Sequence, residues 1–243
     1  MKYGVILAGG TGTRMRSCVP KQFILLNGTP IIIRTLQRFL ASSIFDKVLI
    51  AIHKDYQKVL NDLFLQYGIN GSSIDFVQGG GERFDSIQNT IDFIKSKYGI
   101  YLEDLILIHD AVRPFISRRL IIESFEALKT HEAVVAALPV VDTMLYLDNF
   151  DSPILDMPDR SKLFHGQAPD SFRLKTLYDA IHQINADERA KITGTSQICM
   201  KKGIPVHAIK GDPFNIKITN PFDMKIAEFY CSLDIDNESM CSK

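Results

Sequence analysis

The sequence lacks the features that mark membrane, secreted or nucleic-acid-binding proteins. No apolar run approaches the ~20 residues that a membrane-spanning helix needs. The formal net charge is zero, from 28 basic and 28 acidic residues, so we expect no nucleic-acid partner and no polybasic membrane patch. The cysteines are few (Cys18, Cys199, Cys231 and Cys241) and show no metal-ligand spacing, which predicts reduced thiols in the cytoplasm. The first residues read directly as a strand, so we expect no signal peptide.

Helix and strand signals alternate along most of the 243 residues, of which 46% are hydrophobic. This alternation predicts an α/β fold with a doubly wound, mostly parallel sheet. We expect one domain over residues 1–233 and a flexible tail over residues 234–243. Thr29 and Pro30 are predicted to start one helix, as N-cap and first residue, and Ser117 and Asn220 to cap two others. The predicted strands are residues 4–7, 47–52, 74–77, 105–108, 133–138, 206–209 and 216–218.

A segment rich in turn formers interrupts the alternation. Residues 140–147 and 154–160 each read as a strand, and residues 148–153 between them are dense in Asp, Asn, Ser and Pro. A two-stranded excursion is marginally stable alone. We therefore expect this protruding β-arm (residues 140–165) to pack on a second subunit, which predicts a homodimer.

The stretch over residues 7–15, LAGGTGTRM, lies between the first predicted strand and the first predicted helix. In an open α/β sheet such a loop stands at the carboxyl edge of the strands, where ligands bind. Its glycines let the backbone approach a ligand closely, and successive N–H groups there form an anion-binding concavity. Arg14 and Lys21 add two cations, so the loop suits a nucleoside triphosphate.

Two common phosphate-binding patterns do not fit this loop. The dinucleotide fingerprint fails because Met15 stands where its third glycine should be, and the P-loop fails because no Gly-Lys-Ser/Thr follows. A dehydrogenase is therefore disfavoured. A glycine turn that only reverses the chain remains an alternative at this point.

Two further segments are predicted to end at the same edge of the sheet. Residues 79–81 form a second glycine turn, and residues 109–114 follow the fourth strand. Asp110, at a strand end, is predicted to be a Mg²⁺ ligand or a substrate contact; the alternatives are a helix N-cap and a surface ion pair with Arg113. His109 is expected to be a packed or hydrogen-bonded histidine rather than a catalyst.

Together these segments resemble the 2-C-methyl-D-erythritol 4-phosphate and ribitol 5-phosphate cytidylyltransferases. The resemblance covers nearly the whole chain, with the segments in the same order. It implies a Rossmann-like nucleotidyltransferase sheet, transfer of CMP from CTP to an alditol phosphate, release of pyrophosphate, and Mg²⁺ or another divalent cation as cofactor. The matching segments are residues 7–15, 20–22, 79–86, 109–115, 141–144, 166–169 and 215–219.

The resemblance also implies roles for single residues. The expected nucleotide-binding residues are Leu7, Ala8, Gly9, Gly10, Gly12, Gly80, Gly81 and Ser86. The expected catalytic residues are Arg14, Lys21 and Lys217, and the expected metal ligand is Asp110. The expected acceptor-binding residues are Arg113, Thr143, Arg160 and Thr193, with Arg160 reaching into the active site of a partner subunit.

Elementary chemistry agrees with a site dominated by cations. A phosphate monoester has a second pKa of ~6, so the acceptor is largely dianionic at neutral pH and can attack the α-phosphorus of CTP without a general base. Catalysis then consists of bringing two polyanions together and stabilising the charge that spreads in the transition state. Five cations, Arg14, Lys21, Arg113, Arg160 and Lys217, stand at matching positions.

The departures from the resemblance concern the acceptor. Methylerythritol-phosphate enzymes usually carry Asp where Phe214 stands, Thr-Pro-Gln at residues 168–170, where this chain has Ala-Pro-Asp, and Asp where Gly194 stands. Phe214 and the Gly-Gln pair at residues 166–167 are more like the ribitol branch, although that branch usually keeps Thr at Ala168. Because lost polar contacts change which substrate hydroxyls a pocket can pair, we expect D-ribitol 5-phosphate or a close alditol phosphate, feeding a surface polymer. The alternatives are methylerythritol phosphate, in isoprenoid synthesis, and a non-catalytic nucleotide sensor.

Overall fold

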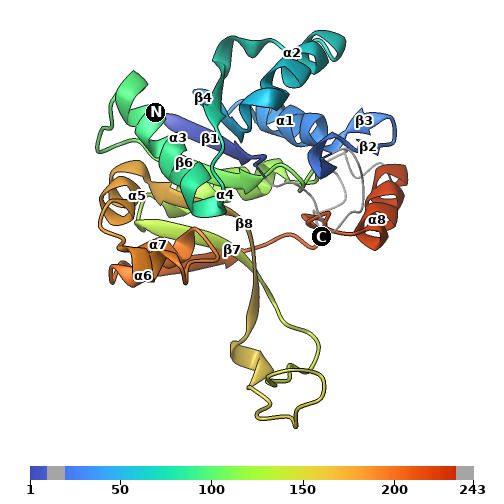
Figure 1. The fold of residues 1–243 in the computed structure, drawn as a ribbon, viewed down its shortest axis with the longest axis vertical. Helices are drawn as coiled ribbons and strands as arrows, with labels where there is room; N and C mark the ends of the chain where they lie inside the picture. Colours follow the sequence, from blue (N-terminus) through green and yellow to red (C-terminus); the bar gives the residue numbers. More distant parts are fainter. Residues whose placement is uncertain (10–19, 234–243) are drawn as a thin grey trace.

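The computed structural model describes residues 1–9 and 20–233, and in these a seven-stranded sheet forms the centre of the protein (Figure 1). The strand order is β5-β4-β1-β6-β8-β7-β9. The strands are β1 Lys2–Leu7, β4 Lys47–Ile52, β5 Ile74–Gln78, β6 Leu105–Asp110, β7 Ala133–Pro139, β8 Phe164–Arg173 and β9 Val206–Lys210. A separate short hairpin pairs β2 Leu25–Leu26 with β3 Thr29–Pro30. The predicted α/β fold with a mostly parallel sheet is confirmed.

Within the described residues, β8 runs antiparallel to both of its neighbours, β6 and β7, and the other neighbouring pairs are parallel. The β-arm leaves the sheet between β7 and β8 and protrudes from the body (Figure 1). The return along β8 starts at the carboxyl edge, where Phe164 pairs with Pro139. It then passes Asp170 alongside Ile108, two positions before the end of β6.

Successive side chains of a strand point to opposite faces of the sheet, and both faces of this sheet are buried by helices. Ile6, Ile50 and Leu107 face a cluster completed by helices α1, α2 and α4, whereas Val5 and Ile108 face a cluster completed by α3, α5 and α7. The helices are α1 Ile31–Ser42, α2 Gln57–Gln66, α3 Arg83–Tyr98, α4 Arg118–Ala127, α5 Leu174–Ile181, α6 Ala186–Arg189, α7 Ser196–Lys201 and α8 Pro221–Ser232. None of these helices is both long and apolar enough to cross a membrane.

Two of the three predicted helix N-caps are confirmed. The Ser117 side chain accepts a hydrogen bond from the Leu120 N–H, and the Asn220 side chain accepts from the N–H groups of Phe222 and Asp223. The third prediction is wrong by one residue. Pro30 takes the N-cap position of α1 with no side-chain cap, because the backbone at residues 29–30 is used by the β2–β3 hairpin.

Three strand predictions are corrected. Residues 140–147 and 154–160 form no paired strands, only an isolated bridge between Tyr146 and Asp156, because the exposed arm has no third strand or core to stabilise a ladder. Residues 216–218 are not a strand either, although the Ile218 N–H donates to the Val112 carbonyl. Conversely, β8 was not predicted. Pro169 obscures it, but the register shifts by two residues there, so this proline stands in a bulge of the strand.

Candidate active site

A cavity of about 220 Å³ lies where β1 and β6 end, at the edge of the sheet that the sequence predicted. Its walls come from the end of β1, residues 21–22, the turn before α3 with the start of that helix, the residues around the end of β6, and Lys217. The predicted site residues that line it are Leu7, Ala8, Gly9, Lys21, Gly80, Gly81, Ser86, Asp110 and Lys217. The structure therefore brings these residues together. Gly10, Gly12 and Arg14 lie outside the described residues, as do Cys18, Cys241 and the tail at residues 234–243.

The glycine turn before α3 is shaped by close backbone contact. A Cβ at Gly80 would lie 2.0 Å from the Asp85 Cβ, so only glycine fits there. The Gly80 N–H donates to Ser86 Oγ at 3.0 Å, and this hydroxyl in turn donates to the Glu82 carbonyl. A Cβ at Gly9 would stand 3.3 Å from the same hydroxyl. The two glycine segments thus approach each other closely beside Ser86, and both line the cavity with backbone rather than with side chains.

Gln22 ties the segment that follows residues 10–19 to the end of β1. Gln22 belongs to the short 3-10 helix η2, Lys21–Phe23, and its buried Nε2 donates to the Ala8 carbonyl at 2.8 Å. This hydrogen bond fixes the backbone next to Lys21, which lines the cavity. Gln22 belongs to the matching segment 20–22, but the sequence alone predicts no role for it.

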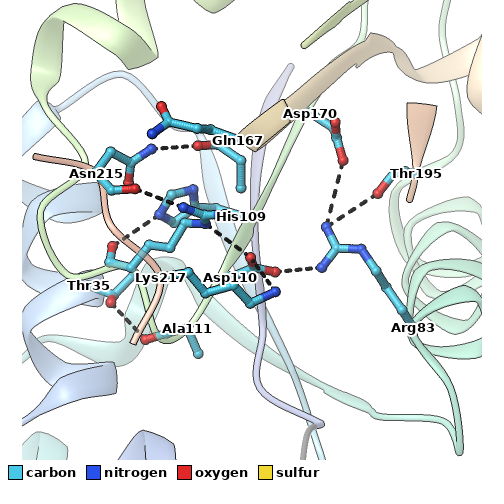
Figure 2. A network of polar contacts seen from close by, with 12 residues as sticks. Thr35, Arg83, His109, Asp110, Ala111, Gln167, Asp170, Thr195, Asn215 and Lys217 are labelled. Atoms are coloured by element: carbon cyan, nitrogen blue, oxygen red, sulfur yellow. Dashed lines mark hydrogen bonds and ion pairs between the residues drawn. The ribbon is translucent and has the colours of Figure 1, made fainter. Parts of the chain in front are cut away.

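Asp110 stands at the centre of a cluster of charges. Its carboxylate oxygens lie 2.5 Å from Arg83 Nη1, 3.2 Å from Arg113 Nε and 3.1 Å from Lys217 Nζ. Burial alone would raise the pKa of Asp110, but the neighbouring cations, Arg83 first, outweigh burial and hold this pKa far below its usual range. Figure 2 shows Arg83 and Lys217 converging on Asp110. The ion pair with Arg113, one of the alternatives considered for Asp110, is present and is buried.

Arg83 links Asp110 to a second buried carboxylate. Its Nη2 lies 3.6 Å from Asp170 Oδ2 and donates to Thr195 Oγ1 at 3.4 Å (Figure 2). Burial raises the pKa of Asp170 to about 6, with Arg83 and Thr195 opposing the shift. No site role for Arg83, Asp170 or Thr195 was predicted. The signals were present in the sequence, because Arg83 belongs to the matching segment 79–86 and Asp170 is one of the departures from the resemblance.

Asn215 connects this cluster to β8. Arg113 Nη1 donates to the Asn215 carbonyl at 2.8 Å, and the buried Asn215 Nδ2 donates to the Ala168 carbonyl at 2.6 Å. His109 lies beneath, fully buried, with its Nε2 3.1 Å from the Arg113 carbonyl and its ring against Phe39. Burial lowers the pKa of His109 to about 4, so its imidazole is neutral at pH 7. It is the packed histidine that the sequence analysis expected.

The other predicted acceptor residues are spread more widely. Arg113 belongs to the charge cluster, whereas Thr143 and Arg160 are exposed on the β-arm, where Arg160 donates to the Val141 carbonyl. Within one chain the structure does not bring these two residues to the cavity. Thr193 is exposed in the loop before α7, bonded to Gln197 Oε1, and stands two residues from Thr195.

The donor set at the cavity fits a divalent cation that arrives with its substrate. The described residues contain no group of three or more His, Cys, Asp or Glu side chains that could hold a metal ion by themselves. Mg²⁺ is commonly bound by one or two carboxylates together with substrate phosphates. Asp110 offers one such carboxylate, and the other charged residues that line the cavity are Lys21, Glu82, Arg83 and Lys217.

Comparison with known proteins finds relatives that match nearly the whole chain. Residues 3–232 match the family described as IspD, 2-C-methyl-D-erythritol 4-phosphate cytidylyltransferase. The chain is 36% identical over 228 residues to a ribitol-5-phosphate cytidylyltransferase of Lactiplantibacillus plantarum, covering 93% of this chain and 97% of the relative.

Solved structures agree with the fold. The 2-C-methyl-D-erythritol 4-phosphate cytidylyltransferase of Francisella tularensis has a TM-score of 0.79 at 28% identity, covering 94% of this chain and 98% of that one. The 4-diphosphocytidyl-2C-methyl-D-erythritol synthase of Anaerococcus prevotii has a TM-score of 0.77 at 25% identity, covering 95% and 98%.

Proposed function

Because the chain belongs to the 2-C-methyl-D-erythritol 4-phosphate cytidylyltransferase family, and is thus a nucleotidyltransferase, we propose that it transfers CMP from CTP to D-ribitol 5-phosphate. The products are CDP-ribitol and pyrophosphate. The observation that carries the choice of acceptor is the 36% identity, over 93% of the chain, to a ribitol-5-phosphate cytidylyltransferase. Methylerythritol phosphate is the second candidate, favoured by the family match and by the solved structures.

In this reaction an oxygen of the acceptor phosphate forms a bond to the α-phosphorus of CTP, and the bond from that phosphorus to the bridging oxygen of pyrophosphate breaks. The facing glycine turns around Ser86 hold the base and ribose side of the nucleotide, and Lys21 neutralises phosphate charge. Arg14, Gly10 and Gly12 belong to the same proposal through the sequence resemblance. A bound divalent cation, with Asp110 as a ligand, supplies further neutralisation of the phosphates.

Lys217 and Arg113 hold the acceptor phosphate on the other side of Asp110. Each lies within about 3 Å of that carboxylate; Lys217 lines the cavity itself, whereas Arg113 stands behind Asp110. An incoming phosphate competes with Asp110 for these cations rather than having to order them. Such preorganisation is the main source of catalysis when no covalent or acid–base step is needed.

We also propose that the functional unit is a homodimer in the cytoplasm, where CTP is available. The β-arm exposes large apolar side chains that no part of the described chain covers: Val141, Leu145, Tyr146, Phe150, Ile154, Leu155 and Met157. A second copy of the chain also explains Thr143 and Arg160, because both are exposed on the arm, which protrudes from the body (Figure 1), and neither lines the cavity of its own chain. In a two-fold dimer each arm reaches the other subunit's site.

The acceptor is tested by pyrophosphate release from CTP and Mg²⁺ with either ribitol 5-phosphate or methylerythritol 4-phosphate. Turnover with ribitol 5-phosphate alone supports the proposal. Turnover with methylerythritol 4-phosphate alone overturns the choice of acceptor, and CTP binding without turnover on either compound favours a sensor.

Subunit sharing is tested by mixing two inactive variants, Arg160→Ala and Lys217→Ala, after dissociation and reassociation. A mixed dimer has one site with its own Lys217 and the partner's intact arm. Random pairing therefore restores about a quarter of wild-type activity if the arms are shared. If each arm serves its own subunit, mixing restores nothing.

A further inference from the structure

The charge cluster contains one carboxylate that the reaction outlined above does not use. Asp170 is on β8, in register with Ile108 of β6, and only 6% of its surface is exposed. It does not line the cavity, so it has no direct access to the nucleotide. Its basic neighbour is Arg83, which does line the cavity.

Arg83 is shared between two carboxylates through different nitrogen atoms. Nη1 pairs with Asp110 at 2.5 Å, whereas Nη2 faces Asp170 at 3.6 Å and Thr195 Oγ1 at 3.4 Å. The guanidinium is planar and rigid, so contacts at both ends fix its plane as well as its position. Figure 2 shows Arg83 extended from α3 with Asp110 on one side and Asp170 and Thr195 on the other.

We propose that Asp170 is a positioning residue, which holds Arg83 between β6 and β8 so that its guanidinium contributes positive charge to the reacting phosphates. The inference rests on the proposed cytidylyltransferase reaction. With Asp170 present, the pull of Asp110 on Arg83 is balanced from the opposite side. Without it, Arg83 is held mainly through Nη1 by Asp110, so its guanidinium can rotate about that contact and its charge is no longer fixed toward the phosphates.

A purely structural role does not account for Asp170. A buried carboxylate is costly unless it is well paired, and its closest ion-pair contact, at 3.6 Å, is longer than that of Asp110. Burial also raises the pKa of this carboxyl, which is the opposite of what a stabilising ion pair does. A neutral side chain of the same size would fill this position without the cost of burying a charge. The negative charge of Asp170 is therefore explained by its effect on Arg83.

The test compares Asp170→Asn with Asp104→Asn as a matched control. Asp104 is equally buried, but lies at the opposite edge of the sheet, bonded to the amino group of Met1. We expect Asp170→Asn to lower kcat roughly tenfold or more while the Kd for CTP changes less than about twofold, because the nucleotide-binding turns are untouched. The control should leave both values within about twofold of wild type.

Two arms of the experiment separate positioning from general damage. In an Arg83→Ala background, adding Asp170→Asn should change kcat less than about twofold, since a residue that acts through Arg83 has no effect without it. Thr195→Val removes the other Nη2 partner and should lower kcat in the same direction. The proposal is overturned if Asp170→Asn leaves kcat unchanged, or if its effect is as large without Arg83 as with it.

A readout independent of turnover keeps this inference apart from the proposed function. Side-chain NMR of Arg83 should show slow rotation of its guanidinium in the wild type, and rotation at least about tenfold faster in Asp170→Asn. Slow rotation in both proteins overturns the positioning role even if turnover is as proposed. Conversely, absence of turnover on both alditol phosphates refutes the reaction, while the NMR result still decides whether Asp170 holds Arg83.

Discussion

Replacing Asp170 by Asn should make the protein more stable at pH 8, and this gain should disappear as the pH falls. Burial raises the pKa of this carboxyl from 3.8 to about 6. Between these two values the folded protein binds more protons at Asp170 than the unfolded chain does, so its free energy of unfolding decreases as the pH rises. The shift of about two pH units corresponds to about 3 kcal/mol at 1.36 kcal/mol per unit, fully lost above pH 6.

Asparagine resembles the protonated acid in size and charge and does not ionise. The variant is therefore expected to exceed wild type by about 3 kcal/mol at pH 8 and by close to zero near pH 4. His109 titrates in the same range in the opposite sense, because its pKa is lowered by burial to about 4 and its contribution is lost as the pH falls below 6.5. Both proteins carry His109, so its effect cancels in the difference between them.

Urea denaturation followed by circular dichroism at pH 4.5, 6 and 8 measures this difference, provided both proteins show the same m value. A difference in unfolding free energy that does not change with pH would refute the reasoning, as would a variant less stable than wild type at pH 8. A stability gain at pH 8 accompanied by the loss of kcat proposed above would show directly that the carboxylate is there for activity.

Three further outcomes are expected. Asn220→Ala should lower the free energy of unfolding by about 1 kcal/mol in urea denaturation, since it removes the side chain that caps α8; no change would show that the cap is dispensable. Burial raises the pKa of the Cys199 thiol to about 12, so iodoacetamide at pH 8 should leave Cys199 unmodified in native protein, as read by peptide mass spectrometry, and alkylate it after unfolding. Phe150 is fully exposed on the β-arm, and Phe150→Asp should shift the protein toward monomer in sedimentation velocity if the arm is covered by a second copy; an unchanged dimer would place the interface elsewhere.

Local rules predicted the elements whose own residues determine them. The strands of the parallel part are short buried runs, and the start of α8 is encoded by three adjacent residues, so both could be read without tertiary information. The same strand predictions located the site at the correct edge of the sheet, because Asp110 is at the end of one of these strands. Asp110 lies near the glycine turns because parallel strands end at the same edge of the sheet.

The rest depends on contacts that sequence patterns do not contain. β8 holds a Gly, a Pro and two buried polar residues, and it becomes a strand because β6 and β7 flank it on both sides. The β-arm shows the opposite error, because residues 140–147 and 154–160 read as strands but, among the described residues, they pair only through the bridge between Tyr146 and Asp156. Arg83 and Asp170 are 87 positions apart, and only the pairing of β8 with β6 brings their charges together.

The carboxylates explain how a site for two polyanions can be ordered before they bind. Two like charges at ~4 Å repel by about 4 kcal/mol at an effective dielectric constant of 20, so a group of cations alone would spread apart. Asp110 draws Arg83, Arg113 and Lys217 to one point, and Asp170 holds Arg83 from the other side. Phosphate oxygens can then replace carboxylate oxygens as partners of these cations with little movement. The acidic residues of this site therefore contribute to anion binding by keeping its cations in place.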